Sequence, residues 1–263
     1  MPIGACRRVR PLDRFRTFRR SEELVLKPSE AKSFYDRFGK KQDTQSFYEN
    51  PALDDLIAHA SFSEAKKVFE FGCGTGRFAA SLLSEHLPAE ATYVGCDLSR
   101  TMVDLATERL AIYLERARVV QSDGTVLFPV SDYSVDRVIS TYVLDLISEA
   151  DIEKFFLEAY RALNVGGKVC LVGLTKGVTF LSHIVVAIWT LVFHLRASLV
   201  GGCRPISLEQ YANQKLWELE YRNVVTAFGV PSEVLVARAK HSSEPGAAEE
   251  RGERLRWISV KAL

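Results

Sequence analysis

The sequence has 263 residues, of which 47% are hydrophobic and 25% charged, and this composition excludes collagen-like, coiled-coil and wholly disordered chains. The formal net charge of +1 argues against a dedicated nucleic-acid-binding protein, which carries a strong basic surplus. The charge is uneven, because residues 1–20 hold seven arginines and one acid, Asp13, so that this segment carries +6 and the rest of the chain −5. The length favours one catalytic domain with terminal extensions.

The arginine-rich leader, residues 1–28, precedes every motif of the chain. It lacks the apolar stretch of a secretory signal, which leaves a disordered basic tail or an organelle transit peptide as its interpretations. The five cysteines are scattered and form no zinc-binding pattern, so we expect no metal and a reducing compartment. The expected location is the cytoplasm, or an organelle if the leader is a transit peptide.

Residues 29–60 predict helices rich in aromatic side chains. After them, short apolar runs predict buried strands, and helical stretches near residues 77–86, 100–111 and 149–163 lie between these runs. Alternating strands and helices predict a parallel sheet with helices on both faces. The five predicted strands are residues 67–71, 92–96, 118–121, 135–140 and 168–173.

The last third of the chain follows a different pattern. The glycines of Asn164-Val-Gly-Gly predict a helix end directly before the fifth strand, and residues 178–200 predict an apolar helix. Residues 217–228 and 233–238, on either side of Gly229-Val-Pro-Ser, predict an antiparallel hairpin at the edge of the sheet. We therefore expect an α/β fold with a doubly wound, mostly parallel seven-stranded sheet over residues 29–240, an apolar cap over 178–212, and a flexible tail over 241–263.

The sharpest motif is the stretch Val-Phe-Glu-Phe-Gly-Cys-Gly-Thr-Gly-Arg at residues 68–77. Its glycines allow positive φ angles and a close approach of a ligand, and the N–H groups of the loop could hold an anionic group. A dinucleotide fingerprint would need a glycine at Arg77, and the lysine of a phosphate-binding P-loop is absent. Glu70, two residues before the first glycine, repels phosphate and attracts an ammonium group. This favours S-adenosylmethionine.

With the motifs that follow it, this loop resembles the class I S-adenosylmethionine-dependent methyltransferases, in particular the small-molecule branch of ubiquinone and menaquinone biosynthesis. The resemblance covers residues 33–238 and implies a Rossmann-like fold, S-adenosyl-L-methionine as cofactor and methyl transfer. It implies that Asp97, at the end of the second predicted strand, accepts the ribose hydroxyls, and that Leu98 and Met102 flank the adenine. The alternative is that Asp97 and Ser99 only cap the next helix.

The resemblance also implies that Asp123 accepts the adenine amino group, although Asp123-Gly124 is also an ordinary turn dipeptide. It implies that residues 29–60 form a lid, with Tyr35 over the methionine end of the cofactor and Gln42 and Phe47 as the next candidates. The alternative is a helix that packs its aromatic side chains on the core. The predicted cofactor-binding residues are Glu70, Gly72, Cys73, Gly74, Gly76, Asp97, Leu98, Met102, Asp123, Gly124, Thr141 and Tyr35.

Methyl transfer is an in-line displacement, for which the protein must align donor and acceptor and exclude water. A base is needed only if the acceptor loses a proton, and the candidates are His183, His194 and Asp145, with His59 as a further one. His183 and His194 are eleven residues apart, which places them on one face of a helix. No catalytic residue is assigned by the sequence.

The acceptor is expected to be a small, apolar molecule. The chain has no Asn-Pro-Pro-Tyr-like stretch for a flipped base, and the charge of −5 outside residues 1–20 disfavours nucleic acid. Polar side chains interrupt residues 178–200, which favours a wall of the acceptor pocket over a transmembrane helix, with shallow membrane contact as the alternative. The oligomeric state stays open.

Two other functions fit parts of the sequence. A cofactor-binding module of the same fold could have lost turnover, although nothing in the glycine loop is degraded. A nicotinamide-dependent oxidoreductase is disfavoured by Arg77 in place of the third glycine.

Overall fold

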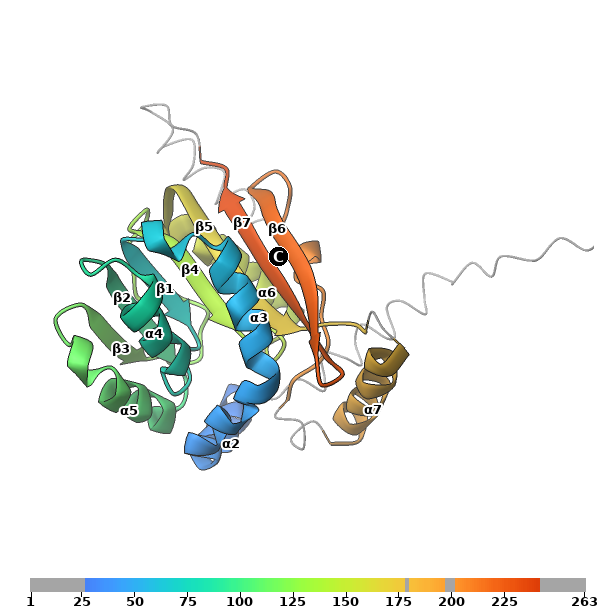
Figure 1. Cartoon of the computed structure of the whole chain (residues 1–263). Helices are drawn as coiled ribbons and strands as arrows, with labels where there is room; N and C mark the ends of the chain where they lie inside the picture. Colours follow the sequence, from blue (N-terminus) through green and yellow to red (C-terminus); the bar gives the residue numbers. More distant parts are fainter. Residues whose placement is uncertain (1–26, 178–179, 197–201, 242–263) are drawn as a thin grey trace, which may run out of the picture.

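The computed structural model describes residues 27–177, 180–196 and 202–241 (Figure 1). Residues 1–26 of the predicted leader and residues 242–263 of the predicted tail therefore lie outside the described residues. One seven-stranded sheet runs through the molecule in the order β3-β2-β1-β4-β5-β7-β6. Its strands are β1 (Lys67–Phe71), β2 (Thr92–Asp97), β3 (Ala117–Gln121), β4 (Val135–Thr141), β5 (Leu163–Leu174), β6 (Trp217–Ala227) and β7 (Val230–Ala239).

The first five strands are parallel, and β7 pairs antiparallel with both β5 and β6. The predicted architecture, a mostly parallel seven-stranded sheet with an antiparallel hairpin at its C-terminal edge, is therefore confirmed. The strand order reverses between β1 and β4, and in open α/β sheets ligands bind outside the carboxyl ends of the strands at such a switch point.

Helices precede the sheet, separate its strands and form a segment after β5. They are α2 (Pro28–Phe38), α3 (Ser46–His59), α4 (Arg77–Ser81), α5 (Arg100–Arg109), α6 (Glu149–Ala162) and α7 (Phe180–Arg196), with the short helices η1 (Gly39–Gln45), η2 (Phe62–Glu64), η3 (Leu82–His86), η4 (Ala111–Tyr113) and η6 (Glu209–Tyr211). The hydroxyl oxygen of Ser99 accepts a hydrogen bond from the Met102 N–H, and that of Ser148 accepts one from the Asp151 N–H. These caps satisfy N–H groups in the first turns of α5 and α6.

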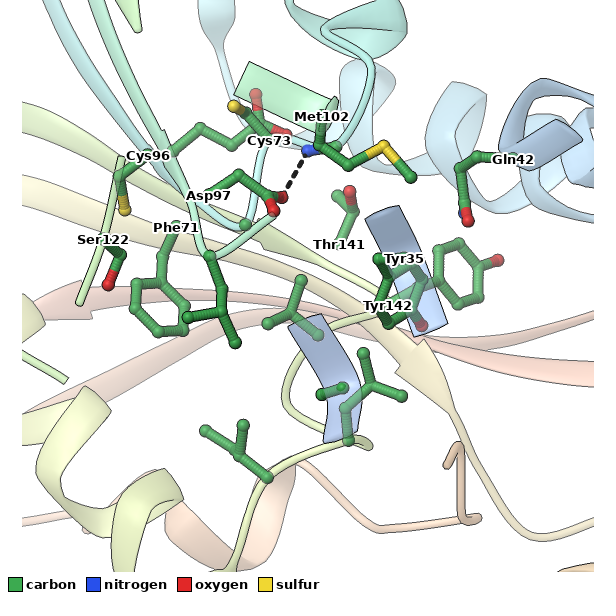
Figure 2. Close-up of a pocket in the computed structure, with 18 of the residues that line it drawn as sticks. Tyr35, Gln42, Phe71, Cys73, Cys96, Asp97, Met102, Ser122, Thr141 and Tyr142 are labelled. Carbon is green, nitrogen blue, oxygen red and sulfur yellow. Dashed lines mark hydrogen bonds between the residues drawn. The ribbon is translucent and has the colours of Figure 1, made fainter. Parts of the chain in front are cut away.

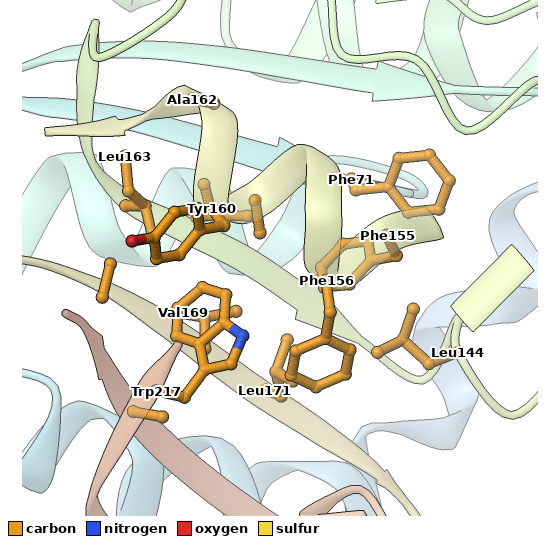
Figure 3. Close-up of a cluster of buried hydrophobic side chains, with 14 of the residues drawn as sticks. Phe71, Leu144, Phe155, Phe156, Tyr160, Ala162, Leu163, Val169, Leu171 and Trp217 are labelled. Carbon is orange, nitrogen blue, oxygen red and sulfur yellow. The ribbon is translucent and has the colours of Figure 1, made fainter. Parts of the chain in front are cut away.

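The hydrophobic core consists of one cluster on each face of the sheet. Figure 1 shows α3 and α4 on one face and α6 on the other. The α6 side contains Phe155, Phe156 and Tyr160, and the rings of Phe156 and Tyr160 pack against Trp217 of β6 (Figure 3). The α3 side contains Leu53 and further apolar residues of α3, η2 and α4. Burial on both faces explains why the central strands read as continuous apolar runs.

Two predictions for the C-terminal strands β5 and β7 are wrong. Asn164-Val-Gly-Gly does not precede β5 but lies within it: α6 already ends at Ala162, and the pairing of β4 with β5 shifts register between Val135 and Arg137. Gly166, with φ of 81°, helps the chain through this irregularity. Pro231 likewise lies inside β7, because the turn of the hairpin is formed earlier, at Phe228 and Gly229.

The predicted apolar helix after β5 is observed as α7, which packs next to β7. Ile188 and Leu191 on α7 are 58% and 59% exposed. Among the residues that the structure describes, no helix combines the length and the apolar character needed to cross a membrane.

Candidate functional site

A cavity of about 360 Å³ lies at the carboxyl ends of the central strands, beneath α2 and η1. Its wall includes residues that follow β1, β2, β3 and β4, four strands that are neighbours in the sheet. In Figure 2, Ser122 and Cys96 lie at one end, Asp97 and Thr141 lie between, and Tyr35, Gln42 and Tyr142 lie at the other end. Its size and its place at the switch point are those of a small-molecule site.

The glycine loop follows β1 and forms one wall of the cavity. The N–H groups of Gly72 and Cys73 donate to the Cys96 carbonyl at 2.8 and 3.0 Å, and the N–H of Gly74 donates to Asp97 Oδ2 at 2.9 Å. These donors are engaged inside the protein, so the loop lacks the row of N–H groups that would hold a phosphate. The anion-binding interpretation of the loop is therefore wrong for these three groups.

Gly72 and Gly74 need to be glycine for different reasons. Both have positive φ angles, 76° and 52°. A Cβ on Gly72 would lie 2.3 Å from Cγ2 of Val143, a clash with a cavity-wall residue, whereas a Cβ on Gly74 would meet no atom within 4 Å. Gly74 therefore borders open space, and a side chain there would enter the cavity.

Asp97 is the last residue of β2 and lies between the two ends of the cavity. Its Oδ1 accepts a hydrogen bond from the Ser99 N–H at 2.8 Å, and its Oδ2 accepts the one from Gly74. Burial raises the pKa of Asp97 to about 6, although these backbone hydrogen bonds oppose the shift. A carboxylate offers about four acceptor sites, so two N–H donors leave room for two hydroxyl donors. Ser99 is the residue whose side chain caps α5, and the Asp97 carboxylate can accept further hydrogen bonds from a ligand in the cavity.

Glu70 lies on β1 below the glycine loop and is only 1% exposed. The Tyr93 hydroxyl donates a hydrogen bond of 2.6 Å to its Oε2. Burial raises the pKa of Glu70 to about 7, and the hydrogen bond from Tyr93 opposes the shift. Gly95 makes this arrangement possible, since a Cβ there would lie 2.6 Å from the Tyr93 hydroxyl.

Most predicted cofactor residues meet at this cavity, but two do not line it. The carboxylate of Asp123 is exposed and accepts hydrogen bonds from Thr125 N and Oγ1 at 2.8 and 2.6 Å, which lower the pKa of Asp123. Gly76 is used for packing, since a Cβ there would lie 3.0 Å from that of Ala106 on α5. The predicted residues that line the cavity are Tyr35, Glu70, Gly72, Cys73, Gly74, Asp97, Leu98, Met102, Gly124 and Thr141.

The predicted lid, α2, η1 and α3, is attached to the helices around the cavity by charged side chains. Asp43 of η1 accepts hydrogen bonds of 2.6 Å from Thr75 of the glycine loop and from Arg109 of α5. Arg109 also donates to the Thr75 hydroxyl at 2.7 Å, which closes a triad. On α2, Asp36 accepts a 2.6 Å hydrogen bond from the Ser99 hydroxyl.

A second attachment joins α3 to α4 at the cavity wall. Arg77 pairs with Glu49 at 2.7 Å and donates to Asn50 Oδ1 at 2.6 Å. Glu49 is 6% exposed, and burial raises the pKa of this carboxyl although Arg77 lowers it. No sequence pattern predicts these attachments, because their partners are 27 to 66 residues apart and follow no motif. The sequence motif marks Arg77 only as the residue that replaces a glycine.

Buried polar side chains lie near Tyr35, which lines the cavity, although Asp145 and Cys203 do not line it themselves. Asp145 is fully buried, its Oδ2 accepts a 3.4 Å hydrogen bond from the Leu174 N–H, and its Oδ1 has no partner within the described part of the chain. Burial raises the pKa of Asp145 to about 7. Tyr35, whose pKa burial also raises, is close enough to Cys203 and Asp145 for both to raise it further.

The other candidate bases lie elsewhere or cannot be described. His183 is exposed on α7, and His59 is stacked on Tyr221 with a ring-centroid distance of 3.5 Å. His194 belongs to α7, but its side chain lies outside the described part, so the predicted shared face of the two histidines stays a prediction. Within the described residues, no group of three or more His, Cys, Asp or Glu side chains is placed to hold a metal ion.

Comparison with known proteins agrees with this geometry. Residues 68–167 match the methyltransferase-domain family. The methyltransferase-like part thus extends from β1 into β5 and contains the glycine loop and Asp97.

The solved structures share the Rossmann-like methyltransferase fold. The complex between the Haloferax volcanii Trm112 methyltransferase activator and a putative methyltransferase has a TM-score of 0.59 at 17% identity, over 79% of this chain and 98% of that chain. The geranyl diphosphate C-methyltransferase of Streptomyces coelicolor A3(2), in complex with Mg²⁺, geranyl diphosphate and S-adenosyl-L-homocysteine, has a TM-score of 0.56 at 13% identity, over 73% and 79%. At these identities the likeness shows the fold alone.

Among curated relatives, the tRNA N(3)-methylcytidine methyltransferase Mettl2 of Drosophila melanogaster is 25% identical over 149 residues, which are 53% of this chain and 46% of that protein. Other curated relatives are uncharacterised methyltransferases of bacteria. The chain spans about half the length of the curated relatives it matches. The ubiquinone and menaquinone branch stays a prediction.

Proposed function

We propose that the protein is an S-adenosylmethionine-dependent methyltransferase that transfers a methyl group to a small, apolar molecule. The observation that carries the proposal is the position of Asp97. Two backbone N–H groups hold its carboxylate in the middle of a cavity that reaches from the end of β3 to the end of β4. The match to a methyltransferase domain over residues 68–167 supports the same reaction.

The residues around the cavity fit S-adenosylmethionine. Gly74 borders open space, Asp97 has free acceptor capacity for ribose hydroxyls, and Leu98 and Met102 offer apolar surface for the adenine. The N–H groups of Gly72, Cys73 and Gly74 donate to acceptors inside the protein, which suits a ligand without phosphate. When bound, S-adenosylmethionine would supply a methyl group on a cationic sulfur. The chain would orient it and exclude water from the reacting end.

Binding of S-adenosylhomocysteine, measured by isothermal titration calorimetry, tests the proposal. We expect the parent protein to bind, and Gly74→Asp to abolish measurable binding because the new side chain enters the cavity. Gly166→Asp is the matched control, since Gly166 also has positive φ and no atom within 4 Å of a built Cβ, but does not line the cavity. Absence of binding to the parent protein would refute the proposal, and tight binding of NAD would favour an oxidoreductase.

For the acceptor, apolar residues support a small, lipophilic molecule. Leu53, Val143, Leu146 and Ile147 line the cavity together with Tyr142, which has a φ of 56°. Such a conformation is uncommon for a non-glycine residue, and strain of this kind clusters at functional sites. If the acceptor must lose a proton, the surroundings of Asp145 favour it over the exposed His183 as the base.

The tRNA methyltransferases among the relatives favour RNA as the second candidate acceptor. Transfer of radiolabelled methyl groups from S-adenosylmethionine to an organic extract of small molecules, or to total tRNA, distinguishes the two. We expect label in the organic extract. Label in tRNA would replace the small-molecule assignment, and cofactor binding without transfer to either would favour a non-catalytic module.

A further inference from the structure

Gln42 of η1 stands out among the residues that line the cavity. Its Nε2 donates to Gln45 Oε1 at 2.9 Å and approaches Glu49 Oε1 at 3.5 Å. A flipped amide would direct its oxygen at these two acceptors, so the observed orientation is the one that the surroundings favour. The remaining oxygen, Oε1 of Gln42, is buried and has no hydrogen-bond partner in the residues the structure describes.

A buried carbonyl oxygen without a partner is costly, and each such atom in a native protein calls for an explanation. Gln42 contributes to the cavity wall, so a ligand can supply the missing donor. In Figure 2 the amide of Gln42 extends toward Tyr35, at the end of the cavity opposite Ser122. The donor must therefore belong to the part of the ligand farthest from the end of β3.

The chemistry of the proposed cofactor identifies this donor. If the ribose were held at Asp97 and the adenine near Ser122 and Gly124, the amino-acid part would extend toward the Gln42 end of the cavity. The adenine amino group and the ribose hydroxyls would then lie on the far side, and the α-ammonium would be the one strong donor left for a carbonyl oxygen. Arg77 also lines the cavity and is held by Glu49, the residue that Gln42 approaches, so its positive charge, although paired with Glu49, lies on the side that suits the α-carboxylate.

We propose that Gln42 Oε1 accepts a hydrogen bond from the α-ammonium of S-adenosylmethionine, so that the lid residue recognises the amino-acid end of the cofactor. This inference rests on the proposed function. It makes Gln42 a specificity-determining residue that distinguishes the full cofactor from adenosine thioethers without an amino acid. It also couples the position of η1 to cofactor binding, because the donor reaches Gln42 only with η1 over the cavity.

The test compares two ligands that differ only at this end. S-adenosylhomocysteine carries the ammonium and carboxylate, and 5′-methylthioadenosine lacks both. Gln42→Leu keeps the approximate size of the side chain but removes the acceptor. We expect it to weaken S-adenosylhomocysteine binding about 10- to 100-fold, the range for a lost hydrogen bond to a charged group. The affinity for 5′-methylthioadenosine, measured by calorimetric competition, should change less than about twofold.

Two further variants separate the oxygen from the lid network. Gln42→Glu keeps an acceptor at the same position and should retain most of the affinity for S-adenosylhomocysteine. Gln214→Leu makes the matched change at an exposed position outside the cavity lining and should leave both affinities close to those of the parent protein.

Each outcome decides the inference. If Gln42→Leu lost affinity for both ligands equally, the residue would act through the position of the lid, and the proposed contact with the α-ammonium would be overturned. An unchanged affinity for S-adenosylhomocysteine would also overturn it, while the proposed function would stand. If the parent protein bound neither ligand, the proposed function itself would fail and the inference with it.

Discussion

At the scale of single residues, Asp97 is the carboxylate on which recognition of the nucleoside depends. We expect Asp97→Ala to weaken S-adenosylhomocysteine binding by about 1–3 kcal/mol, because hydrogen bonds to a charged acceptor are lost. Asp104→Ala, which removes an exposed carboxylate on α5, is the control and should leave the affinity unchanged. Calorimetry at pH 7.5 gives both values, and a parent-like affinity of Asp97→Ala would refute the ribose contact.

The residues that the sequence could predict are those whose position follows from one strand and the turn after it. Glu70, Gly72 and Asp97 lie at the ends of β1 and β2, and parallel strands bring such ends to one edge. The same reasoning predicts that Asp123, after β3, lines the cavity. Two hydrogen bonds from Thr125 instead hold its side chain against the local loop. The contacts of Gln42 could not be predicted, since they depend on how a preceding helix packs on the finished sheet.

At the scale of elements, the lid and the cavity are joined by the Asp43–Thr75–Arg109 triad. Arg109→Ala removes two of its three hydrogen bonds and leaves the Asp43 carboxylate without its cation. We expect faster amide hydrogen exchange over residues 39–45 and an affinity for S-adenosylhomocysteine that is about 3- to 10-fold lower, since one partly exposed ion pair contributes modestly.

The control for this prediction is on the same helix. Arg100 pairs with Asp104 on an exposed side of α5, and Arg100→Ala should change neither exchange nor affinity. If Arg109→Ala left the exchange of residues 39–45 at the parent rate, the triad would not hold the lid.

Predictability differs among elements for a physical reason. β1 was predicted with the observed ends, and α5 within two residues, because an apolar run or a serine cap marks each boundary. The observed bounds of β5 and β7 differ from the predicted ones because glycine and proline predict interruptions of a strand. An irregular register in β5 accommodates Gly166, and Pro231 is the second residue of β7, next to the hairpin turn, so tertiary pairing overrides the local preference.

At the scale of the whole molecule, the acidic body of the chain concentrates buried carboxyls around one cavity. Burial raises the pKa of Glu70 to about 7, of Asp97 to about 6 and of Asp145 to about 7. Each value exceeds that of the unfolded chain, so the folded state binds more protons between about pH 4 and 7. The stabilisation from proton binding is complete at low pH and is lost as the pH rises through the folded pKa values. A cationic ligand should offset this loss.

Asp145→Asn isolates one part of this effect, because it replaces a carboxyl with a side chain that stays neutral. We expect the free energy of unfolding of the variant, relative to the parent protein, to increase by about 2–4 kcal/mol between pH 5 and pH 8. The parent protein must hold a buried carboxylate at pH 8, with an oxygen that has no partner among the described residues, whereas at pH 5 it holds a neutral acid. Urea denaturation without ligand at both pH values measures the difference, and Asp104→Asn, at an exposed position, should show no such trend. A constant difference between Asp145→Asn and the parent protein would mean that Asp145 does not titrate in this range in the folded state, and would remove the argument for it as a base near neutral pH.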